Sequence, residues 1–84
     1  MLFISILELE SAINYWRLKS PSVGETLQLS PEVAALAKHY AMLIIQGAQR
    51  EALDLLDEKA REAWYGYQDA MRQQNELKDT HKGA

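Results

Sequence analysis

The 84-residue sequence contains no cysteine, only two prolines and four glycines, and no long hydrophobic run. Without cysteine, the chain has no disulfide, no thiol nucleophile and no sulfur ligand for a metal ion. Its most apolar stretch, residues 40–45, is far shorter than the roughly 20 residues that cross a bilayer. The apolar residues at 1–4 have no basic residues before them and form too short a run for a signal peptide. We therefore expect a cytoplasmic protein that has no membrane segment.

Length and composition predict one small globular domain. Apolar residues make up 48% of the chain and charged residues 25%, with a formal net charge of −3, which is a typical balance for a folded domain. A chain of this size has a small core and a narrow margin of stability, so a partner or self-association would add to it. We expect a single helical domain over residues 1–78, followed by a frayed tail at 79–84 that has no apolar anchor.

A first helix is predicted over residues 6–19. Ser5 and Glu8 have the spacing of a capping box, in which each side chain accepts a hydrogen bond from the backbone N–H of the other residue. Pro21 disfavours helical geometry at the residue before it, and this ends the helix. The apolar residues between these two signals recur on one face, so the helix is amphipathic.

A second helix is predicted over residues 31–46, after a loop at 20–30 that is rich in Pro, Ser and Gly. Ser30 is suited to the N-cap, and Pro31 to the first helical position, where its missing N–H costs nothing. Gly47 is suited to a left-handed C-terminal cap. Apolar residues cover about 200° of the circumference of this helix, so we expect it to be the central one. The narrow arc suited to water carries Glu32, Lys38, His39 and Gln46.

A third helix is predicted over residues 50–77, because one apolar face keeps its register through most of this range. Gly66 lies inside it and costs about 1 kcal/mol relative to alanine, but the apolar face resumes in phase after it. This helix would be about 42 Å long at 1.5 Å per residue, roughly twice the length of the first. Its uncovered part, at Trp64, Tyr67 and Met71, would expose apolar surface of the kind found at interfaces. We therefore expect a homodimer.

The fold class expected from these elements is all-α, a three-helix domain whose third helix is overlong. Three helices of this size leave little room for a concave pocket with convergent polar groups, so we do not expect an enzyme. The two histidines, His39 and His81, have no metal-ligand partner at a suitable spacing. We accordingly expect no catalytic residue, no cofactor and no metal ion.

The first helix carries an unusual string of residues. Glu8-Leu9-Glu10 is followed by Ala12-Ile13-Asn14-Tyr15-Trp16-Arg17 and then by Ser20-Pro21, and a later stretch reads Leu36-Ala37 and Tyr40-Ala41-Met42. Over about residues 4–64, this pattern resembles a family of short, uncharacterised proteobacterial proteins, a domain of unknown function. The resemblance implies a bacterial source, and it carries over no activity and no site residue.

Asn14, Tyr15 and Arg17 in this string are candidate contact residues. At helical spacing they point away from the core face, on which Ile13 and Trp16 lie. A surface Tyr or Arg is ordinary on its own, but an arginine beside an aromatic ring is a common pair at protein interfaces. The predicted interaction residues are therefore Asn14, Tyr15, Arg17, Trp64, Tyr67 and Met71.

Acidic residues in the third helix leave two alternative functions open. Asp54, Glu58 and Glu62 recur every four residues, and carboxylates that converge bind a hard cation or a small ligand. The simpler interpretation is a solvated face. The second and third helices, joined at Gly47, resemble a helix-turn-helix. The acids at the start of the third helix would repel phosphates, so a basic protein surface is a more complementary partner than nucleic acid.

We therefore expect a small, non-enzymatic bacterial protein-interaction or regulatory module that self-associates through the third helix. The alternatives are a nucleic-acid-associated regulator with a helix-turn-helix-like arrangement, and a protein that binds a cation or small ligand on the carboxylate face.

Overall fold

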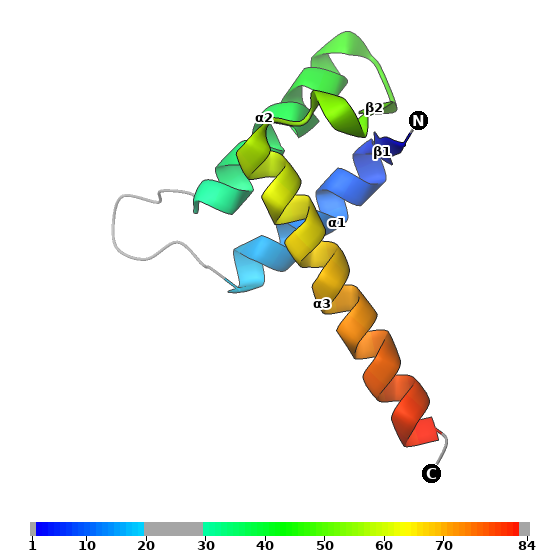
Figure 1. The fold of residues 1–84 in the computed structure, drawn as a ribbon. Helices are drawn as coiled ribbons and strands as arrows, with labels where there is room; N and C mark the ends of the chain where they lie inside the picture. Colours follow the sequence, from blue (N-terminus) through cyan, green and yellow to red (C-terminus); the bar gives the residue numbers. More distant parts are fainter. Residues whose placement is uncertain (1, 20–29, 83–84) are drawn as a thin grey trace.

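Within the residues that the structure describes, the fold consists of three α-helices, a two-stranded antiparallel sheet and a 3₁₀ turn (Figure 1). The computed structural model describes the backbone of residues 2–19 and 30–82, and the side chains of this part up to Gln74. The predicted three-helix, mainly α-helical fold is confirmed, whereas the loop expected at 20–30 lies outside the described residues except for Ser30. The elements are β1 (Phe3–Ser5), α1 (Ile6–Lys19), α2 (Pro31–Gln46), β2 (Arg50–Ala52), the 3₁₀ turn η1 (Leu53–Leu55) and α3 (Glu58–Lys82).

The start of α1 is the predicted capping box. The backbone N–H of Ser5 donates to Glu8 Oε1 at 2.9 Å, and the backbone N–H of Glu8 donates to Ser5 Oγ at 3.0 Å. These two bonds satisfy donors that a helix N-terminus otherwise leaves free. The predicted bounds of this helix, 6–19, are confirmed.

Both ends of α2 also follow the sequence signals. The Ser30 hydroxyl accepts from the backbone N–H of Val33 at 3.2 Å, and Pro31 occupies the first turn. Gly47 adopts a left-handed conformation with φ of 66°, and its N–H donates to the Ile44 carbonyl. A residue with a Cβ would be strained at this φ. The predicted helix 31–46 is confirmed.

The prediction that a helix begins at residue 50 is wrong. Residues 50–52 form β2, which pairs with β1 in the register Phe3 to Ala52, Ile4 to Glu51 and Ser5 to Arg50. Hydrogen bonds from Ile6 N–H to the Gln49 carbonyl and from Leu53 N–H to the Leu2 carbonyl extend the ladder at both ends. This pairing satisfies backbone groups of 50–53 that a helix would otherwise pair internally.

The third helix instead begins at Glu58, and Asp57 is its N-cap residue. Its Oδ1 accepts from the backbone N–H of Ala60 at 2.9 Å, as an N-cap side chain does. From Glu58 the helix runs without a break through Gly66 to Lys82, five residues past the predicted end at 77. At 25 residues it is the longest of the three helices, about 37 Å at 1.5 Å per residue, and its C-terminal part extends away from α1 and α2 (Figure 1).

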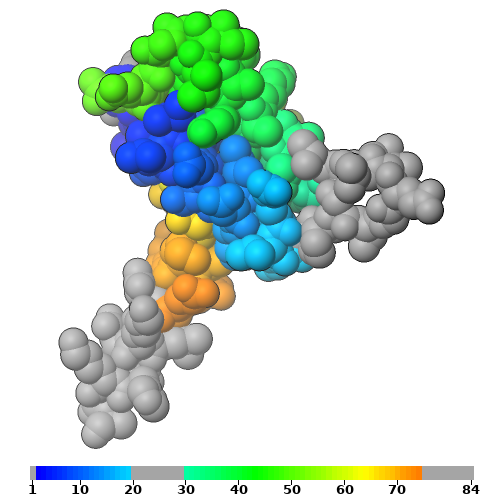
Figure 2. All heavy atoms as spheres, turned by 180° about the vertical axis from the view of Figure 1, so that it is seen from behind, coloured from blue at the N-terminus to red at the C-terminus, as the bar shows by residue number. Residues whose placement is uncertain are grey.

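The core lies where the three helices and β1 meet. Each helix contacts the other two, so α2 is not the single central helix that its apolar circumference predicts. Seen from behind, α1 lies across the body and the orange part of α3 emerges below it (Figure 2). The buried apolar residues of the core cluster are Ile4, Leu9, Ala12, Leu36, Leu43, Leu53, Leu56, Ala60, Ala63 and Trp64.

The orientation of α2 differs from the prediction on both sides of the helix. His39, predicted to face water, is only 7% exposed. Ile44 and Ile45, predicted to be covered, are 56% and 83% exposed. Apolar residues cover more than half of the circumference of α2, so periodicity alone does not fix which side turns inward. None of the helices in residues 2–19 and 30–82 combines the length and apolar character that spanning a membrane requires.

Candidate functional site

Trp16 of α1 contacts the backbone of α3 at the point where the two helices cross. Trp16 Nε1–H donates to the carbonyl of Ala63 at 2.9 Å. A Cβ built at Gly66, one turn further along α3, would lie 3.0 Å from Trp16 Cζ2. Gly66 therefore lets the indole lie directly on the α3 backbone, which a larger residue would push away.

Four aromatic rings cluster at this crossing. Tyr15 packs edge-on against Trp16 and against Tyr67, with centroid distances of 5.2 and 5.6 Å. Trp64 lies 5.6 Å from Tyr67 by the same measure. Such edge-on pairs add about 0.5–1.5 kcal/mol each beyond the apolar area that they bury. The ring cluster, defined as Tyr15, Trp16, Trp64 and Tyr67, thus ties α1 to the middle of α3.

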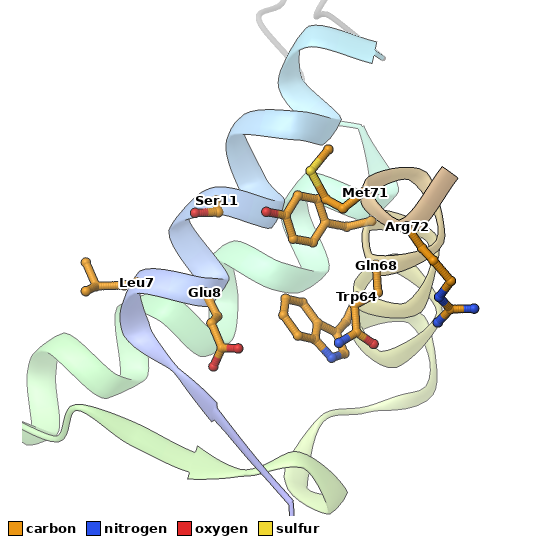
Figure 3. A pocket seen from close by; sticks show the side chains of 8 residues that line it. Leu7, Glu8, Ser11, Trp64, Gln68, Met71 and Arg72 are labelled. Atoms are coloured by element: carbon orange, nitrogen blue, oxygen red, sulfur yellow. The ribbon is translucent and has the colours of Figure 1, made fainter. Parts of the chain in front are cut away.

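Next to the ring cluster, α1 and α3 diverge and leave an open groove of about 500 Å³. Figure 3 shows Trp64 extending from α3 toward α1 and Glu8 pointing back toward α3, while Leu7 points away on the outer side of α1. We call this the α1–α3 groove. Its lining residues are Leu7, Glu8 and Ser11 of α1, with Trp64, Tyr67, Gln68, Met71 and Arg72 of α3.

The lining of the α1–α3 groove is half apolar and half polar. Leu7, Trp64 and Met71 offer apolar and aromatic surface, while Ser11 and Gln68 offer a hydroxyl and an amide for hydrogen bonds. Mixed linings of this kind receive an apolar anchor and fix its orientation with a few polar contacts. The charged groups are already engaged, because Glu8 completes the capping box and Arg72 lies 3.4 Å from Asp69.

Three of the predicted interaction residues line this groove, namely Trp64, Tyr67 and Met71. The expectation that all three are exposed is wrong for Trp64, which is only 5% exposed and belongs to the core cluster. Tyr67 and Met71 are half-buried. The beginning of α1 forms the other side of the groove at this part of α3, which the predicted length mismatch does not anticipate.

The other three predicted residues lie on α1 and differ in burial. Tyr15, expected to point away from the core, is half-buried against Trp16 and Tyr67 at the crossing. Asn14 and Arg17 are exposed on α1. Neither lines the α1–α3 groove, and a contact patch of Asn14, Tyr15 and Arg17 stays a prediction.

A second polar site, missed by sequence reasoning, joins α2 to β2 and to the start of α3. His39 Nδ1 lies 3.0 Å from Glu51 Oε1, and His39 Nε2 lies 3.7 Å from Asp57 Oδ2. Because a carboxylate only accepts, the proton of this first pair is on Nδ1. His39 Nε2 is buried and has no hydrogen-bond partner among the described residues. In the sequence, His39 lies at helical spacing between Leu36 and Leu43, and this spacing is the signal that could have predicted its burial beside the core.

Two groups near these contacts have shifted pKa values. The pKa of Asp57 is lowered, first by the hydrogen bond from the Ala60 N–H and further by the Lys38 ammonium 3.2 Å away, while partial burial opposes the shift. The pKa of Tyr40 is raised, first by the negative charge of Glu10, whose Oε2 accepts from the Tyr40 hydroxyl at 3.3 Å. The Asp57 shift thus arises first from its local N-cap hydrogen bond, and the Tyr40 shift from a contact between α2 and α1.

The arrangements behind the two alternative functions are not those predicted. Asp54 lies in η1 rather than on α3, so it does not share a helical face with Glu58 and Glu62. Within the described residues, no three His, Cys, Asp or Glu side chains converge as they would around a metal ion. Residues 47–57, which join α2 to α3, contain β2 and η1, whereas a helix-turn-helix has a turn of about three or four residues.

The fold and the groove define a small three-helix protein with an open, partly aromatic groove beside a helix crossing. The chain belongs to the family described as "Protein of unknown function (DUF3717)", whose model matches residues 2–69. The resemblance to an uncharacterised family is thereby confirmed, while the proteobacterial source stays a prediction. No curated protein and no solved structure matches the chain.

Proposed function

We propose that the protein is a small, non-enzymatic protein-interaction module that binds an amphipathic segment of a partner protein in the α1–α3 groove. A homodimer is part of this proposal. The observation that supports binding of a partner segment is the groove itself, in which Tyr67 and Met71 remain half-exposed beside buried Trp64. Groups of this type, an aromatic or thioether surface with a polar rim, are enriched where proteins bind one another.

An amphipathic helix is the segment that this groove fits best. The groove lies between two helices, so a third helix laid into it would contact both, as in other helix-in-groove complexes. One apolar side chain of that helix would lie over Trp64 and beside Met71, with Ser11 and Gln68 within reach of its polar groups. A regulatory role and a basic partner surface stay predictions from the sequence.

Co-purification with matched variants tests this proposal. The variant Met71→Glu places a negative charge in the groove. The control variant Leu18→Glu places the same charge on α1, at a residue that is 85% exposed and does not line the groove. We expect a protein that co-purifies in a fixed ratio with the wild type and with Leu18→Glu, and whose recovery falls at least tenfold with Met71→Glu, which corresponds to about 1.4 kcal/mol. Equal recovery with all three chains, at unchanged melting temperature, contradicts the proposal.

A further inference from the structure

Among the residues whose side chains the structure describes, α2 carries more exposed large apolar side chains than α1 or α3, namely Met42, Ile44 and Ile45. The core-facing side of α2 carries Val33, Leu36 and Leu43, which are all buried. On the opposite side, Ile45 is 83% exposed and Met42 is about half-exposed. A helix with so wide an apolar circumference is normally covered on more than one side. By contrast, Trp64, one of the three residues from which a dimer through α3 was expected, is already buried within the chain.

The exposed side of α2 has a regular stripe, which we call the outer stripe. Ala34, Lys38, Ala41 and Ile45 follow one another at helical spacing and are all exposed. At 100° per residue they lie within an arc of about 60°, opposite Leu36. Lys38 carries the only charge in the outer stripe, and its ammonium is 3.2 Å from Asp57 of the same chain. This ion pair reduces the cost of bringing a second apolar surface against the stripe.

The sizes of these side chains indicate what covers them. A small residue, Ala34, stands at the N-terminal end of the outer stripe, and a large residue, Ile45, stands at its C-terminal end. If a second α2 lies antiparallel, Ile45 of each copy faces Ala34 of the other, and Lys38 faces Ala41. Each long side chain then meets a short one, which lets the two helices pack closely. A parallel pair would instead oppose Ile45 to Ile45 and Lys38 to Lys38.

We infer that two copies of this protein pair through the outer stripes of α2, antiparallel about a two-fold axis between Lys38 and Ala41. The stripe is self-complementary under this axis, as the contact in a two-fold dimer must be. Antiparallel helix dipoles favour the same arrangement. The inference rests on the homodimer of the proposed function and assigns its surface, and it leaves the α1–α3 groove free for a different protein.

Sedimentation equilibrium of the wild type and of the variants Ile45→Glu, Leu18→Glu and Met71→Glu tests this assignment. Ile45→Glu is expected to raise the dimer dissociation constant at least tenfold, which corresponds to about 1.4 kcal/mol, because it buries two like-charged groups. Leu18→Glu, a change of the same kind at an equally exposed residue of α1, is expected to leave the dimer intact. Ile45 is largely exposed, so its replacement leaves the melting temperature nearly unchanged.

Cysteine cross-linking tests the antiparallel register, and the chain has no cysteine of its own. In the double variant Ala34→Cys with Ile45→Cys, the two thiols of one chain are about 16 Å apart along α2 and do not bond to each other. Mild oxidation is expected to give a covalent dimer with the double variant, and little with Ile45→Cys alone. Equal cross-linking of the single and double variants overturns the antiparallel register.

The remaining outcomes separate this inference from the proposed function. A wild-type dimer that Met71→Glu breaks and Ile45→Glu does not would overturn the assignment to α2, while the homodimer would hold. A wild type that sediments as a monomer at all concentrations would overturn both the assignment and the homodimer. The first result would place the second copy at the α1–α3 groove, which Met71 lines, whereas a monomeric wild type does not bear on partner binding there, which the co-purification experiment decides.

Discussion

The indole of Trp16 lies on the backbone of Gly66 so closely that a Cβ at position 66 would stand 3.0 Å from Trp16 Cζ2. The ring has little freedom to withdraw, because its Nε1–H is bonded to the Ala63 carbonyl and its edge meets Tyr15. A glycine in the middle of the longest helix is therefore tied to a residue 50 positions earlier in the chain.

Gly66→Ala should consequently destabilise the protein, although alanine is the better helix former. The substitution gains about 1 kcal/mol of helix propensity, but it forces the indole to move and weakens the bond to Ala63, at a cost of about 1–3 kcal/mol for an overpacked contact. We expect a net loss of about 1 kcal/mol, read from urea denaturation.

The same substitution in a Trp16→Phe background serves as the control. The shorter phenylalanine ring does not reach the backbone of Gly66, so Gly66→Ala should there stabilise the protein by up to about 1 kcal/mol. The same sign in both backgrounds would mean that the contact between Trp16 and Gly66 does not decide which residue fits position 66.

His39→Ala is predicted to cost more stability than Glu51→Gln. Removal of the imidazole leaves the partly buried Glu51 carboxylate without its donor, at a cost of about 1–3 kcal/mol. In Glu51→Gln, the side-chain carbonyl still accepts from the Nδ1–H of His39, so the loss should stay below about 1 kcal/mol. Denaturant titration of both variants measures the difference, and similar losses would count against the hydrogen bond as the stabilising contact.

Asp57→Ala should lower stability by about 1 kcal/mol at neutral pH, as the loss of an N-cap residue does. The pKa of Asp57 is lowered in the folded protein, so its ionised form contributes stability above the ordinary aspartate pKa of about 4, and this contribution is lost as the pH falls through the lowered value. The melting-temperature difference between wild type and Asp57→Ala should therefore shrink toward pH of about 3. A constant difference would contradict this assignment.

Glu10→Gln should bring the ionisation of Tyr40 to lower pH. The raised pKa of this phenol arises first from the charge of Glu10, which the amide removes, so the pKa should return toward the usual value of about 10. Ultraviolet difference titration of the wild type and Glu10→Gln at alkaline pH measures this change. Coincident titration curves would show that Glu10 does not act on Tyr40.

Tyr15→Ala and Arg17→Ala should differ in stability although the two residues are close in sequence. Tyr15 packs against Trp16 and Tyr67, so its loss should cost about 1–3 kcal/mol. Arg17 is exposed, and its replacement should change stability by less than about 0.5 kcal/mol. Thermal melts of the two single variants test this, and equal melting temperatures would mean that the ring contacts of Tyr15 contribute little.

Local signals predict the first two helices, because their ends are set by residues that lie within a few positions of each other. Ser5 with Glu8, Ser30 with Val33, and Gly47 each act inside one turn of chain. Such contacts depend little on the rest of the fold, so they can be recognised in the sequence.

The segment at 50–57 could not be predicted in the same way, since a distant part of the chain decides its structure. Leu53, Leu56 and Ala60 have the spacing of a helical face. However, residues 50–52 pair with β1 as a strand, so no helix begins at residue 50. The missed local signal is Asp57, an N-cap residue directly before an acidic first turn. In the candidate site, the sequence identifies the α3 residues, whereas Leu7, Glu8 and Ser11 join them only through the crossing angle of α1.

The ring cluster has a practical consequence for following how this protein unfolds. The chain has two tryptophans, and both lie where α1 crosses α3, one bonded to the Ala63 carbonyl and one in the core beside Tyr67. Tryptophan fluorescence therefore reports on the packing of α3 against α1 and the core, while circular dichroism follows all three helices. Unfolding curves from the two probes that do not coincide would reveal α3 detaching as a separate step.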